Sequence, residues 1–326
     1  MVAPIRVGVL GCANIAWRRT LPAFAESSTA TVVAAASRDP HKAERFAVRF
    51  GCAPVVGYSA LLEREDVDAV YLPLPTGLHA RWAADALRAG KHVLAEKPLA
   101  TTASEATELI SLAEQRDLVL MENRMFSYHT QHEEVRKLVA NGELGELRTL
   151  HATMTIPPLP EDDPRYRAEL GGGALLDVGF YPLHAALLLL TEPLEVLGAD
   201  LHRHPERGVD VRGAVLLRDA NGVTAHLTFG IEHSYRAAYE LSGSQARLVL
   251  ERAFTPPPSW QPVLRIEAQD RSECRTLPAS PQFLNSVNAF TAAVLDRTRP
   301  RDHLRTTLRG LELMDTVRAY DHKGRS

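Results

Sequence analysis

The sequence has few cysteines and no pattern that would pair them. Only three of its 326 residues are cysteine, namely Cys12, Cys52 and Cys274, and they lie far apart. This spacing excludes the paired ligands of a zinc site and the closely spaced thiols of a redox motif, so we expect no bound metal. It also argues against a disulfide framework and for a reducing compartment.

Signals for membrane insertion and nucleic-acid binding are also absent. The longest apolar run, near 185–190, is too short to span a bilayer, and the first residues lack the charged and apolar regions of a signal peptide. A formal net charge of -3 gives no basic footprint for nucleic acid. We therefore expect a cytoplasmic protein that binds neither a membrane nor nucleic acid.

The first part of the chain alternates between strand and helix patterns. Strands are expected at 6–10, 31–36, 67–72, 91–95 and 119–122, with helices running toward 26 and over 40–50, 79–89 and 104–115. This alternation is typical of an α/β fold with a Rossmann-type doubly wound parallel sheet. We assign residues 1–123 to a dinucleotide-binding domain.

The second part has longer, alternating strands. They are expected at 147–156, 194–202, 209–218, 223–231, 238–242 and 246–251, with helices over 132–141, 282–298 and 306–320. Such a run predicts a second α/β domain with a large open, mostly antiparallel sheet. We assign residues 124–326 to this substrate-binding and oligomerisation domain, whose last helix can pack back on the first domain.

The turn after the first strand partly matches a dinucleotide fingerprint. The three fingerprint positions hold Gly11, Ala13 and Ala16, so only the first glycine is kept, although all three residues are small. A plain strand-to-helix turn is an equal alternative on this motif alone. The position of the turn, between the first strand and the first helix, favours pyrophosphate binding. The candidate cofactor-binding residues are Gly11, Cys12, Ala13, Asn14 and Ile15, and we interpret Cys12 as a packing residue rather than a reactive one.

The end of the second strand favours NADP over NAD. Ser37 and Arg38 can donate hydrogen bonds to a 2′-phosphate, with Lys42 a turn later. Asp39 opposes this choice because an acid at this edge suits the free ribose of NAD. Ser37 can also serve as a helix cap.

Two further segments should meet at the same edge of the sheet. The sequence Glu96-Lys97-Pro98 follows a short apolar strand, and proline restricts the backbone of the lysine before it. The Lys97–Pro98 bond is also a candidate for the cis form. Leu74, Pro75 and His79 follow the preceding strand. We therefore expect five further cofactor-binding residues at the carboxyl ends of the strands, namely Leu74, Pro75, His79, Glu96 and Lys97.

A third candidate group follows the glycine run at 171–173. Asp177, Tyr181 and His184 stand at i, i+4 and i+7, the spacing of one helical face, although Pro182 could bend that helix.

These motifs together resemble a known family. Pro-Leu-Pro-x-x-x-His at 73–79, Ala-Gly-Lys-His-Val-Leu at 89–94 and Glu-Lys-Pro-Leu at 96–99 are similar to the glucose-fructose oxidoreductase, inositol dehydrogenase and MocA (Gfo/Idh/MocA) family. The resemblance covers essentially the whole chain and implies a dinucleotide domain followed by an α/β domain whose open sheet often serves oligomer contacts. It also implies an acid at 177 followed by His or Tyr at 181, where this chain has tyrosine.

Within that family, the stretches 11–19, 122–126, 230–236 and 252–257 resemble the sugar 3-ketoreductases of antibiotic deoxysugar pathways. This resemblance implies NADPH-dependent reduction of the C-3 ketone of a TDP-linked 3-keto or 3,4-diketo 2,6-dideoxyhexose. Tyr181 would donate the proton. Lys97 would favour the ionised phenol and hydrogen-bond the substrate oxygen, because a phenol with a pKa near ~10 is otherwise a poor participant. Asp177 would orient the sugar or Lys97. Arg124 departs from the apolar residue expected in close ketoreductases.

A nucleotide-sugar substrate needs cations for its pyrophosphate and aromatic rings for its base. The candidates in the second domain are Arg165, Tyr166, Tyr235, Arg236, Arg252 and Phe254. We select Tyr235 and Phe254 as the substrate-binding residues.

Three alternatives stay open. The chain could be a dihydrodiol dehydrogenase, a simple-sugar dehydrogenase of the same family, or a sensor that binds NADP without turnover. The homo-oligomer that the family's open sheet implies could be a dimer or a tetramer.

Overall fold

The computed structural model describes residues 3–323. Contacts divide the chain into two compact units. The first contains the chain up to Met125 together with Phe283–Leu311, and the second contains Phe126–Gln282 together with the chain from Glu312. Each unit is built on one β-sheet.

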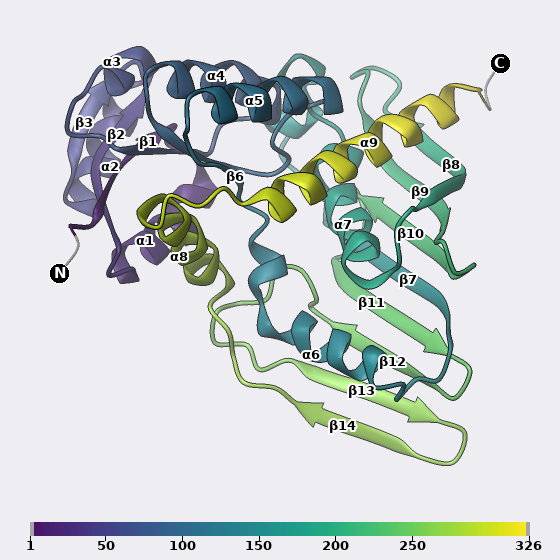
Figure 1. Ribbon diagram of the computed structural model, residues 1–326. Coiled ribbons are helices and arrows are strands. Elements are labelled where there is room, and N and C mark those ends of the chain that lie inside the picture. Colours follow the sequence, from purple (N-terminus) through teal and green to yellow (C-terminus); the bar gives the residue numbers. More distant parts are fainter. Residues whose placement is uncertain (1–2, 324–326) are drawn as a thin grey trace. The chain divides into compact units, whose positions relative to one another are not determined.

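The first unit has a six-stranded parallel sheet in the order β3-β2-β1-β4-β5-β6 (Figure 1). Its strands are β1 (Ile5–Leu10), β2 (Ala30–Ser37), β3 (Ala53–Val56), β4 (Ala69–Leu72), β5 (His92–Ala95) and β6 (Leu120–Glu122). All four residues of β4 are fully buried, because a central parallel strand is covered on both faces. The strand order reverses between β1 and β4, and ligands of open α/β sheets bind at such a switch point.

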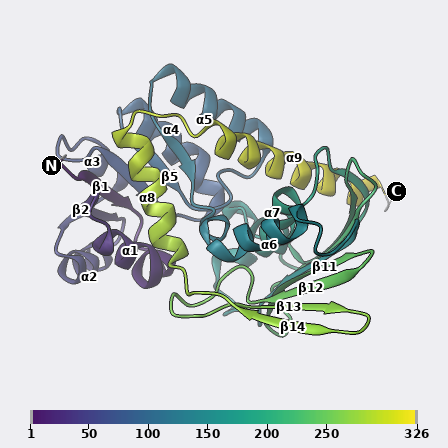
Figure 2. The same ribbon diagram turned by 60° about the horizontal axis from the view of Figure 1, so that its bottom comes forward.

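Helices cover both faces of this sheet, with α4 and α5 on one face and α1 and α8 on the other (Figures 1 and 2). The helices of this unit are η1 (Ala16–Thr20), α1 (Leu21–Glu26), α2 (Pro40–Phe50), α3 (Tyr58–Leu62), η2 (Thr76–Leu78), α4 (His79–Arg88), α5 (Ala103–Gln115), η3 (Met125–Tyr128, at the boundary), α8 (Gln282–Leu295) and the first part of α9 (Arg301–Lys323). Local residues set their ends. Asp39 caps α2, Gly51 ends it in the left-handed conformation, and Thr102 caps α5.

The second unit has an eight-stranded sheet in the order β14-β13-β12-β11-β7-β10-β9-β8. The β7–β10 pair is parallel, and the other pairs are antiparallel. The strands are β7 (Leu147–Thr155), β8 (Glu195–Arg203), β9 (Asp210–Arg218), β10 (Thr224–Gly230), β11 (Arg236–Gly243), β12 (Ala246–Glu251), β13 (Val263–Ala268) and β14 (Ser272–Thr276).

One face of this sheet is covered by helices of the same unit. The helical segments are α6 (Thr130–Ala140), η4 (Pro164–Tyr166), η5 (Ala168–Leu170), η6 (Leu175–Gly179), α7 (Phe180–Leu189) and the last part of α9. η6 and α7 pack on β7 and β10, and α6 lies on the same side (Figures 1 and 2). Along β10, Ala225, Leu227 and Phe229 are buried whereas His226 and Thr228 are exposed. The alternation leaves the opposite face of the sheet open.

The predicted fold class is confirmed in both units. β3, β13 and β14 were not expected from the sequence. Two of these three strands lack the apolar pattern of a strand. β3 has only four residues, including a proline, and β14 has no buried residue.

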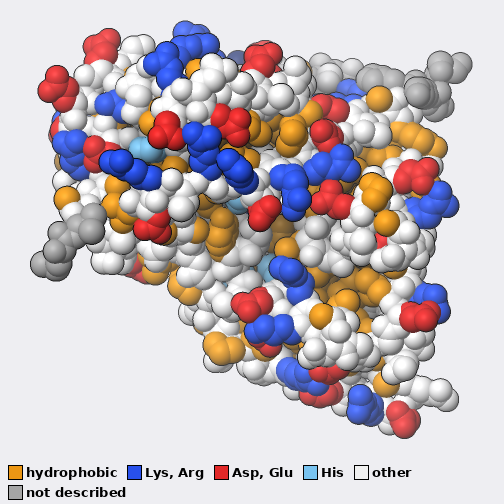
Figure 3. All heavy atoms as spheres, viewed as in Figure 1, with side chains coloured by type: hydrophobic (Ala, Val, Ile, Leu, Met, Phe, Trp, Pro, Cys, Tyr) orange, Lys and Arg blue, Asp and Glu red, His pale blue; other side chains and the backbone are white. Residues whose placement is uncertain are grey.

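Two surface properties bear on the predicted class of protein. On the face shown in Figure 3, Lys and Arg side chains are interspersed with Asp and Glu. Within the described residues, one helical stretch, Ala168–Leu189, is long and apolar enough to cross a membrane, but 72% of its apolar window is buried inside the protein. This burial is typical of a core helix.

Candidate active site

The glycine turn after β1 has the geometry of a phosphate-binding turn. Gly11 adopts a φ of 124°, and a Cβ there would lie 2.7 Å from Leu74 Cδ2, so only glycine fits. The helix that follows begins at Asn14, and Trp17 N donates to Ala13 O. Backbone N–H groups at such a helix start favour an anionic ligand. These residues fit the pyrophosphate of a dinucleotide.

Cys12 in this turn is a packing residue. Its Sγ lies 3.7 Å from Ala36 O, in position to donate a weak hydrogen bond. Burial raises the pKa of the Cys12 thiol to about 12. The thiol is therefore neutral at physiological pH and is a weak nucleophile.

At the end of β2, Arg38 is exposed to solvent, whereas the side chain of Asp39 caps the next helix. Asp39 Oδ1 accepts hydrogen bonds from His41 N at 2.9 Å and Lys42 N at 3.4 Å, so this carboxylate caps α2. Ser37 Oγ accepts from Asp39 N at 3.1 Å, and Arg38 is exposed. The acid that could select NAD is engaged by the helix, which leaves the serine hydroxyl and the guanidinium to meet a phosphate.

His79 connects two loops at the carboxyl edge of the sheet. Its Nδ1 lies 2.8 Å from Pro98 O, and its Nε2 lies 2.7 Å from Leu74 O. The side chain is 1% exposed, and burial lowers the pKa of the imidazole while the two carbonyl contacts oppose that shift. His79 therefore fixes the loop that carries Leu74 and Pro75 relative to the loop that carries Lys97.

Lys97 stands among buried polar groups. Glu96 accepts hydrogen bonds from Tyr71 Oη and Asn123 Nδ2, both at 2.7 Å. Burial raises the pKa of the Glu96 carboxyl, and the charge of Lys97 opposes that shift. The Lys97–Pro98 peptide bond is cis, which confirms that expectation.

A second buried carboxylate, Glu122, was not found from the sequence. It accepts hydrogen bonds from Leu99 N at 2.8 Å and from Arg124 Nη1 and Thr307 Oγ1, both at 3.2 Å. Burial raises the pKa of Glu122, and Arg124 and Lys97 lower it. The unexpected Arg124 thus forms a buried ion pair under the Lys97 loop. Thr307 is far along the chain, so no local pattern could have indicated this network.

In the second unit, Asp177 and Tyr181 lie on consecutive helical segments. Asp177 belongs to the π-helical segment η6, and Tyr181 is in the first turn of α7, where Pro182 is tolerated. A π-helical turn holds more residues than an α-helical turn, so the spacing i, i+4 does not by itself define a shared face. The Asp177 side chain is 21% exposed, whereas His184 is buried against Phe180 with ring centroids 4.1 Å apart.

Aromatic rings hold Tyr181 in place. Its ring centroid lies 5.7 Å from that of Phe126 and 5.5 Å from that of Phe254. Phe254 itself is fully buried, whereas Tyr235 is 44% exposed. Of the two residues selected as substrate-binding, Tyr235 has a side chain exposed to solvent. Phe254 is buried and packs against the ring of Tyr181.

Asp177 is bound by an arginine from the preceding loop. Arg165 Nε donates to Asp177 Oδ2 at 2.5 Å, and its Nη1 donates to Asp163 Oδ1 at 3.2 Å. The glycine run allows this contact, since a Cβ on Gly172 would lie 2.5 Å from Arg165 O. Gly173 N also donates to Arg165 O at 2.9 Å.

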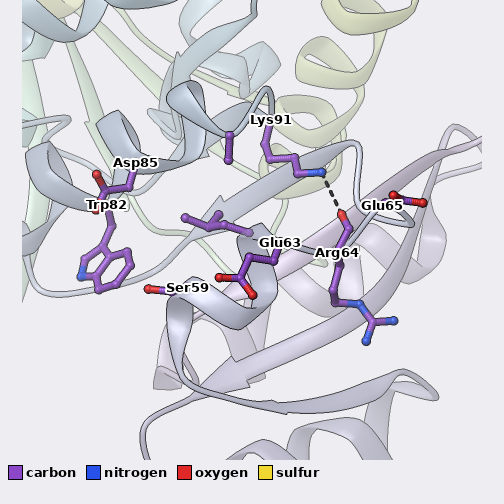
Figure 4. Close-up of a pocket in the computed structure, with 9 residues that line it drawn as sticks. Ser59, Glu63, Arg64, Glu65, Trp82, Asp85 and Lys91 are labelled. Carbon is purple, nitrogen blue, oxygen red and sulfur yellow. Dashed lines mark hydrogen bonds between the residues drawn. The ribbon is translucent and has the colours of Figure 1, made fainter.

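A separate cavity lies elsewhere in the first unit. It is an open groove of about 510 Å³ between α3 and α4, lined among others by Trp82 and Asp85 (Figure 4). Lys91, which precedes β5, donates there to Arg64 O at 2.8 Å. The groove includes residues at the amino ends of β4 and β5, the edge opposite the glycine turn, and none of the candidate site residues lines it. Within the described residues, no three His, Cys, Asp or Glu side chains are grouped to hold a metal ion.

Comparison with known proteins identifies the family. Residues 5–124 match the model of the Gfo/Idh/MocA oxidoreductase family with an NAD-binding Rossmann fold, and residues 132–249 match the C-terminal domain of the same family. The chain belongs to the Gfo/Idh/MocA family. The resemblance inferred from the sequence motifs is thereby confirmed.

Relatives within the Gfo/Idh/MocA family are close and nearly full-length. The chain is 56% identical over 290 residues to a dTDP-3,4-didehydro-2,6-dideoxy-alpha-D-glucose 3-reductase from Saccharopolyspora spinosa, covering 89% of this chain and 87% of that protein. It is 53% identical to the protein of the same name from Actinomadura kijaniata, covering 97% and 95%. A crystal structure of a 3-ketoreductase from Actinomadura kijaniata with NADP and TDP-benzene matches with a TM-score of 0.96 at 53% identity, covering 97% of this chain and 98% of that one.

Proposed function

We propose that this protein reduces the C-3 ketone of a TDP-linked 3-keto or 3,4-diketo 2,6-dideoxyhexose with NADPH. The observation that best supports this proposal is a sequence identity of 49–56% to four 3-reductases, over 89–98% of the chain. This similarity confirms the predicted enzyme class, an NADP-dependent sugar 3-ketoreductase. The reaction belongs to deoxysugar biosynthesis. We further propose that the protein acts in the cytoplasm, together with its nucleotide-sugar substrate.

The first unit fits the cofactor at two places. The turn of Gly11 to Ile15 offers backbone N–H groups to the pyrophosphate, and Ser37 and Arg38 offer donors to the 2′-phosphate. Leu74 packs against the glycine turn and closes one side of it. NADPH, when bound, supplies the hydride for the carbonyl carbon.

Tyr181 and Lys97 are proposed to carry the proton chemistry. The phenol of Tyr181 donates its proton to the oxygen that develops negative charge, and the ammonium of Lys97 favours the ionised phenol that remains. The rigid aromatic support of Tyr181 and the braced loop of Lys97 suit groups that must be held in place. Solved structures of the Actinomadura kijaniata ketoreductase include one with a tyrosine replaced by phenylalanine and others with a lysine replaced by alanine or glutamate.

Asp177 is proposed to orient the sugar. Its carboxylate is partly exposed and is held by Arg165, so it can accept a hydrogen bond from a sugar hydroxyl in a fixed direction. Tyr235 is proposed to contact the substrate, with Phe254 supporting Tyr181 as described above.

The open face of the eight-stranded sheet supports self-association into a dimer or tetramer. On this face, the exposed side chains of β10 are those of His226 and Thr228. The His226 ring stacks on the ring of His151 of β7, with 4.6 Å between the ring centroids. A broad sheet face left uncovered by the chain's own helices is a surface on which a second copy can pack. Sedimentation equilibrium measures the resulting mass, and a monomer at micromolar concentration would contradict this part of the proposal.

The substrate assignment is tested in both directions, by NADPH oxidation with keto sugars and by NADP+ reduction with aldoses and dihydrodiols. We expect turnover with the TDP-linked 3,4-diketo sugar and NADPH, little with free 3-keto sugars and NADPH, and little NADP+ reduction with aldoses or dihydrodiols. Activity restricted to free sugars or dihydrodiols would establish the alternative dehydrogenases. Tight NADPH binding with no reduction of any carbonyl substrate would establish the sensor.

A further inference from the structure

Two buried carboxylates flank the loop that carries Lys97. Glu96 follows β5 and Glu122 ends β6, and both side chains are buried. Burial raises the pKa of both carboxyl groups, and the charge of Lys97 opposes that shift in each. Because such coupling is reciprocal, both carboxylates favour the charged form of Lys97. Glu96 belongs to the motif that identified the loop, whereas the proposed function gives Glu122 no role.

The hydrogen bonds of Glu122 place its carboxylate between the loop and a cation. Oε1 accepts from Leu99 N at 2.8 Å, two residues after Lys97. Oε2 accepts from Arg124 Nη1 and from Thr307 Oγ1, both at 3.2 Å. One oxygen therefore faces the loop and the other faces the guanidinium. The ion pair is a dipole whose negative end lies toward the loop of Lys97.

Arg124 is nearly as buried as the carboxylate that it binds. The side chains of Arg124 and Glu122 are 6% and 0% exposed. Arg124 Nη1 also donates to Thr307 Oγ1 at 3.3 Å, and its Nη2 lies 3.4 Å from His303 Nδ1. Burial raises the pKa of Glu122, and the charge of Arg124 opposes that shift. A buried carboxylate without a cation beside it takes up a proton, so Arg124 keeps the negative charge in place.

Other titratable groups around the loop are His79 on α4, His303 on α9, Tyr71 on β4 and Glu105 on α5. Burial lowers the pKa of both imidazoles and raises that of the phenol, so these three groups are neutral at physiological pH. Glu105 accepts from Thr101 N at 2.9 Å, at the far end of the loop. Glu122 is therefore the carboxylate outside the assigned motif whose charge is coupled to that of the lysine.

We propose that Glu122 and Arg124 act together as positioning residues for Lys97, an inference that rests on the proposed function. Glu122 fixes the loop through Leu99 N, one residue after the carbonyl that His79 holds. Its carboxylate stabilises the ammonium of the lysine, and Arg124 keeps that carboxylate charged. Both residues act through Lys97 rather than on the substrate.

Two double variants separate the charge of the pair from its hydrogen bond. Glu122→Gln/Arg124→Met removes both charges and keeps an oxygen that accepts from Leu99 N, whereas Glu122→Met/Arg124→Met also removes the acceptor. Replacing both partners of a buried ion pair leaves no unpaired charge, so the folded state should survive. Matched controls are Glu105→Gln, which removes the carboxylate at the far end of the loop, and Arg299→Met, which breaks a surface ion pair of 2.8 Å.

The direct readout is the titration of Lys97 itself. The chain contains only five lysines, so 13C NMR of the reductively methylated full-length protein gives few signals, and Lys97→Arg assigns the one required. Glu122→Gln/Arg124→Met should lower the midpoint pH of the Lys97 signal by about 0.5–1 unit, because the ammonium loses the nearer of the two charges. Both controls should keep the wild-type midpoint. An unchanged midpoint in the folded double variant would overturn the inference.

The single variant Arg124→Met tests the role of the arginine. It leaves Glu122 buried without its cation, so the pKa of this carboxyl rises further above its unfolded value of about 4.3. Stability is then fully present below that unfolded value and is lost as the pH rises toward the folded pKa. Between about pH 5 and pH 8, the melting temperature should fall more steeply than in Glu122→Gln/Arg124→Met, and Arg124→Lys should restore the wild-type slope. Equal slopes in the single and the double variant would overturn the role of Arg124.

Kinetics distinguish positioning from general stability. In Glu122→Gln/Arg124→Met, the alkaline limb of kcat/KM should move to lower pH by the same amount as the Lys97 midpoint, with kcat at neutral pH within about threefold of wild type. In Glu122→Met/Arg124→Met, kcat should fall about tenfold, because the loop loses its anchor. Equal kcat values in the two double variants would overturn the anchoring role. A Lys97 midpoint that shifts as expected in a protein that reduces no carbonyl would instead overturn the proposed function and leave the inference standing.

Discussion

Arg165 Nε donates a hydrogen bond to Asp177 Oδ2 at 2.5 Å, and Arg165 also contacts Asp163. The nearby carboxylates raise the pKa of the guanidinium, Asp177 most strongly. Arg165 therefore positions the carboxylate that is proposed to orient the sugar, although it does not itself belong to the motif that identified Asp177.

Replacing this arginine tests its positioning role. Arg165→Met should lower kcat/KM by about tenfold, because Asp177 loses its defined direction. Arg165→Lys should recover part of the loss. The matched control is Arg167→Met, since Arg167 is paired with Glu169 at 2.7 Å on the same loop. Equal losses for Arg165→Met and Arg167→Met would show that only the loop's general stability matters.

The proposed proton chemistry gives a second prediction. Tyr181→Phe and Lys97→Met should each reduce turnover by about tenfold or more, because the phenol and the cation act on the same proton. NADPH binding should survive in both, as measured by fluorescence titration. Near-normal turnover in both variants would defeat the assignment.

Cofactor choice can be tested at the end of β2. Arg38→Ala should raise KM for NADPH by about tenfold and leave KM for NADH nearly unchanged, because only NADPH carries the 2′-phosphate. Arg45→Ala, an exposed arginine on α2, is the control. Equal wild-type affinity for the two cofactors would contradict the role of Ser37 and Arg38.

The brace formed by His79 should affect both stability and turnover. His79→Ala leaves the Leu74 and Pro98 carbonyls without their partner, at a cost of about 1–3 kcal/mol in the free energy of unfolding. His79→Gln, which retains one donor, should fall between the wild type and alanine in kcat and in KM for NADPH. A variant that lost stability with unchanged kinetic constants would indicate a purely structural histidine.

Two buried histidines predict loss of stability in acid. Burial lowers the pKa of His129 to about 4 and that of His132 to about 3, whereas both titrate near ~6.5 when unfolded. Between those values the unfolded state binds protons that the folded state does not. Stability is therefore fully present above about pH 6.5 and falls as the pH is lowered, by up to about 1.4 kcal/mol per pH unit for each histidine.

The urea midpoint of the second unit at about pH 7 and about pH 5 measures this effect. His132→Phe should show the smaller pH dependence, although it also loses the contact with Tyr239 Oη at 3.0 Å. Exposed His41→Asn should behave as the wild type. A pH dependence that His132→Phe leaves intact would contradict the explanation.

Local patterns in the sequence predicted the elements that carry the site. The glycine turn at Gly11, the strand before Lys97 and the helix after His79 are defined by apolar spacing and by turn residues, and they stand where expected. The family and the enzyme class followed from motifs at the same places.

Other parts depend on contacts that no local pattern contains. Glu122 and Thr307 are 185 residues apart, and the buried network that joins them under the Lys97 loop forms only after folding. Phe254 is aromatic, and nothing near it in the sequence shows that it is buried against Tyr181. The π-helical turn at Asp177 likewise alters a spacing that an α-helix would have fixed.

The most direct test of the proposed reaction uses NADPH with deuterium at both C4 positions of its nicotinamide ring. The TDP-linked 3,4-diketo sugar is reduced in a single incubation, and the product is examined by proton NMR and mass spectrometry. We expect one deuterium per product molecule, located at C-3 of the hexose, together with loss of the C-3 proton signal. A product with deuterium at C-4, or with none at C-3, would contradict it.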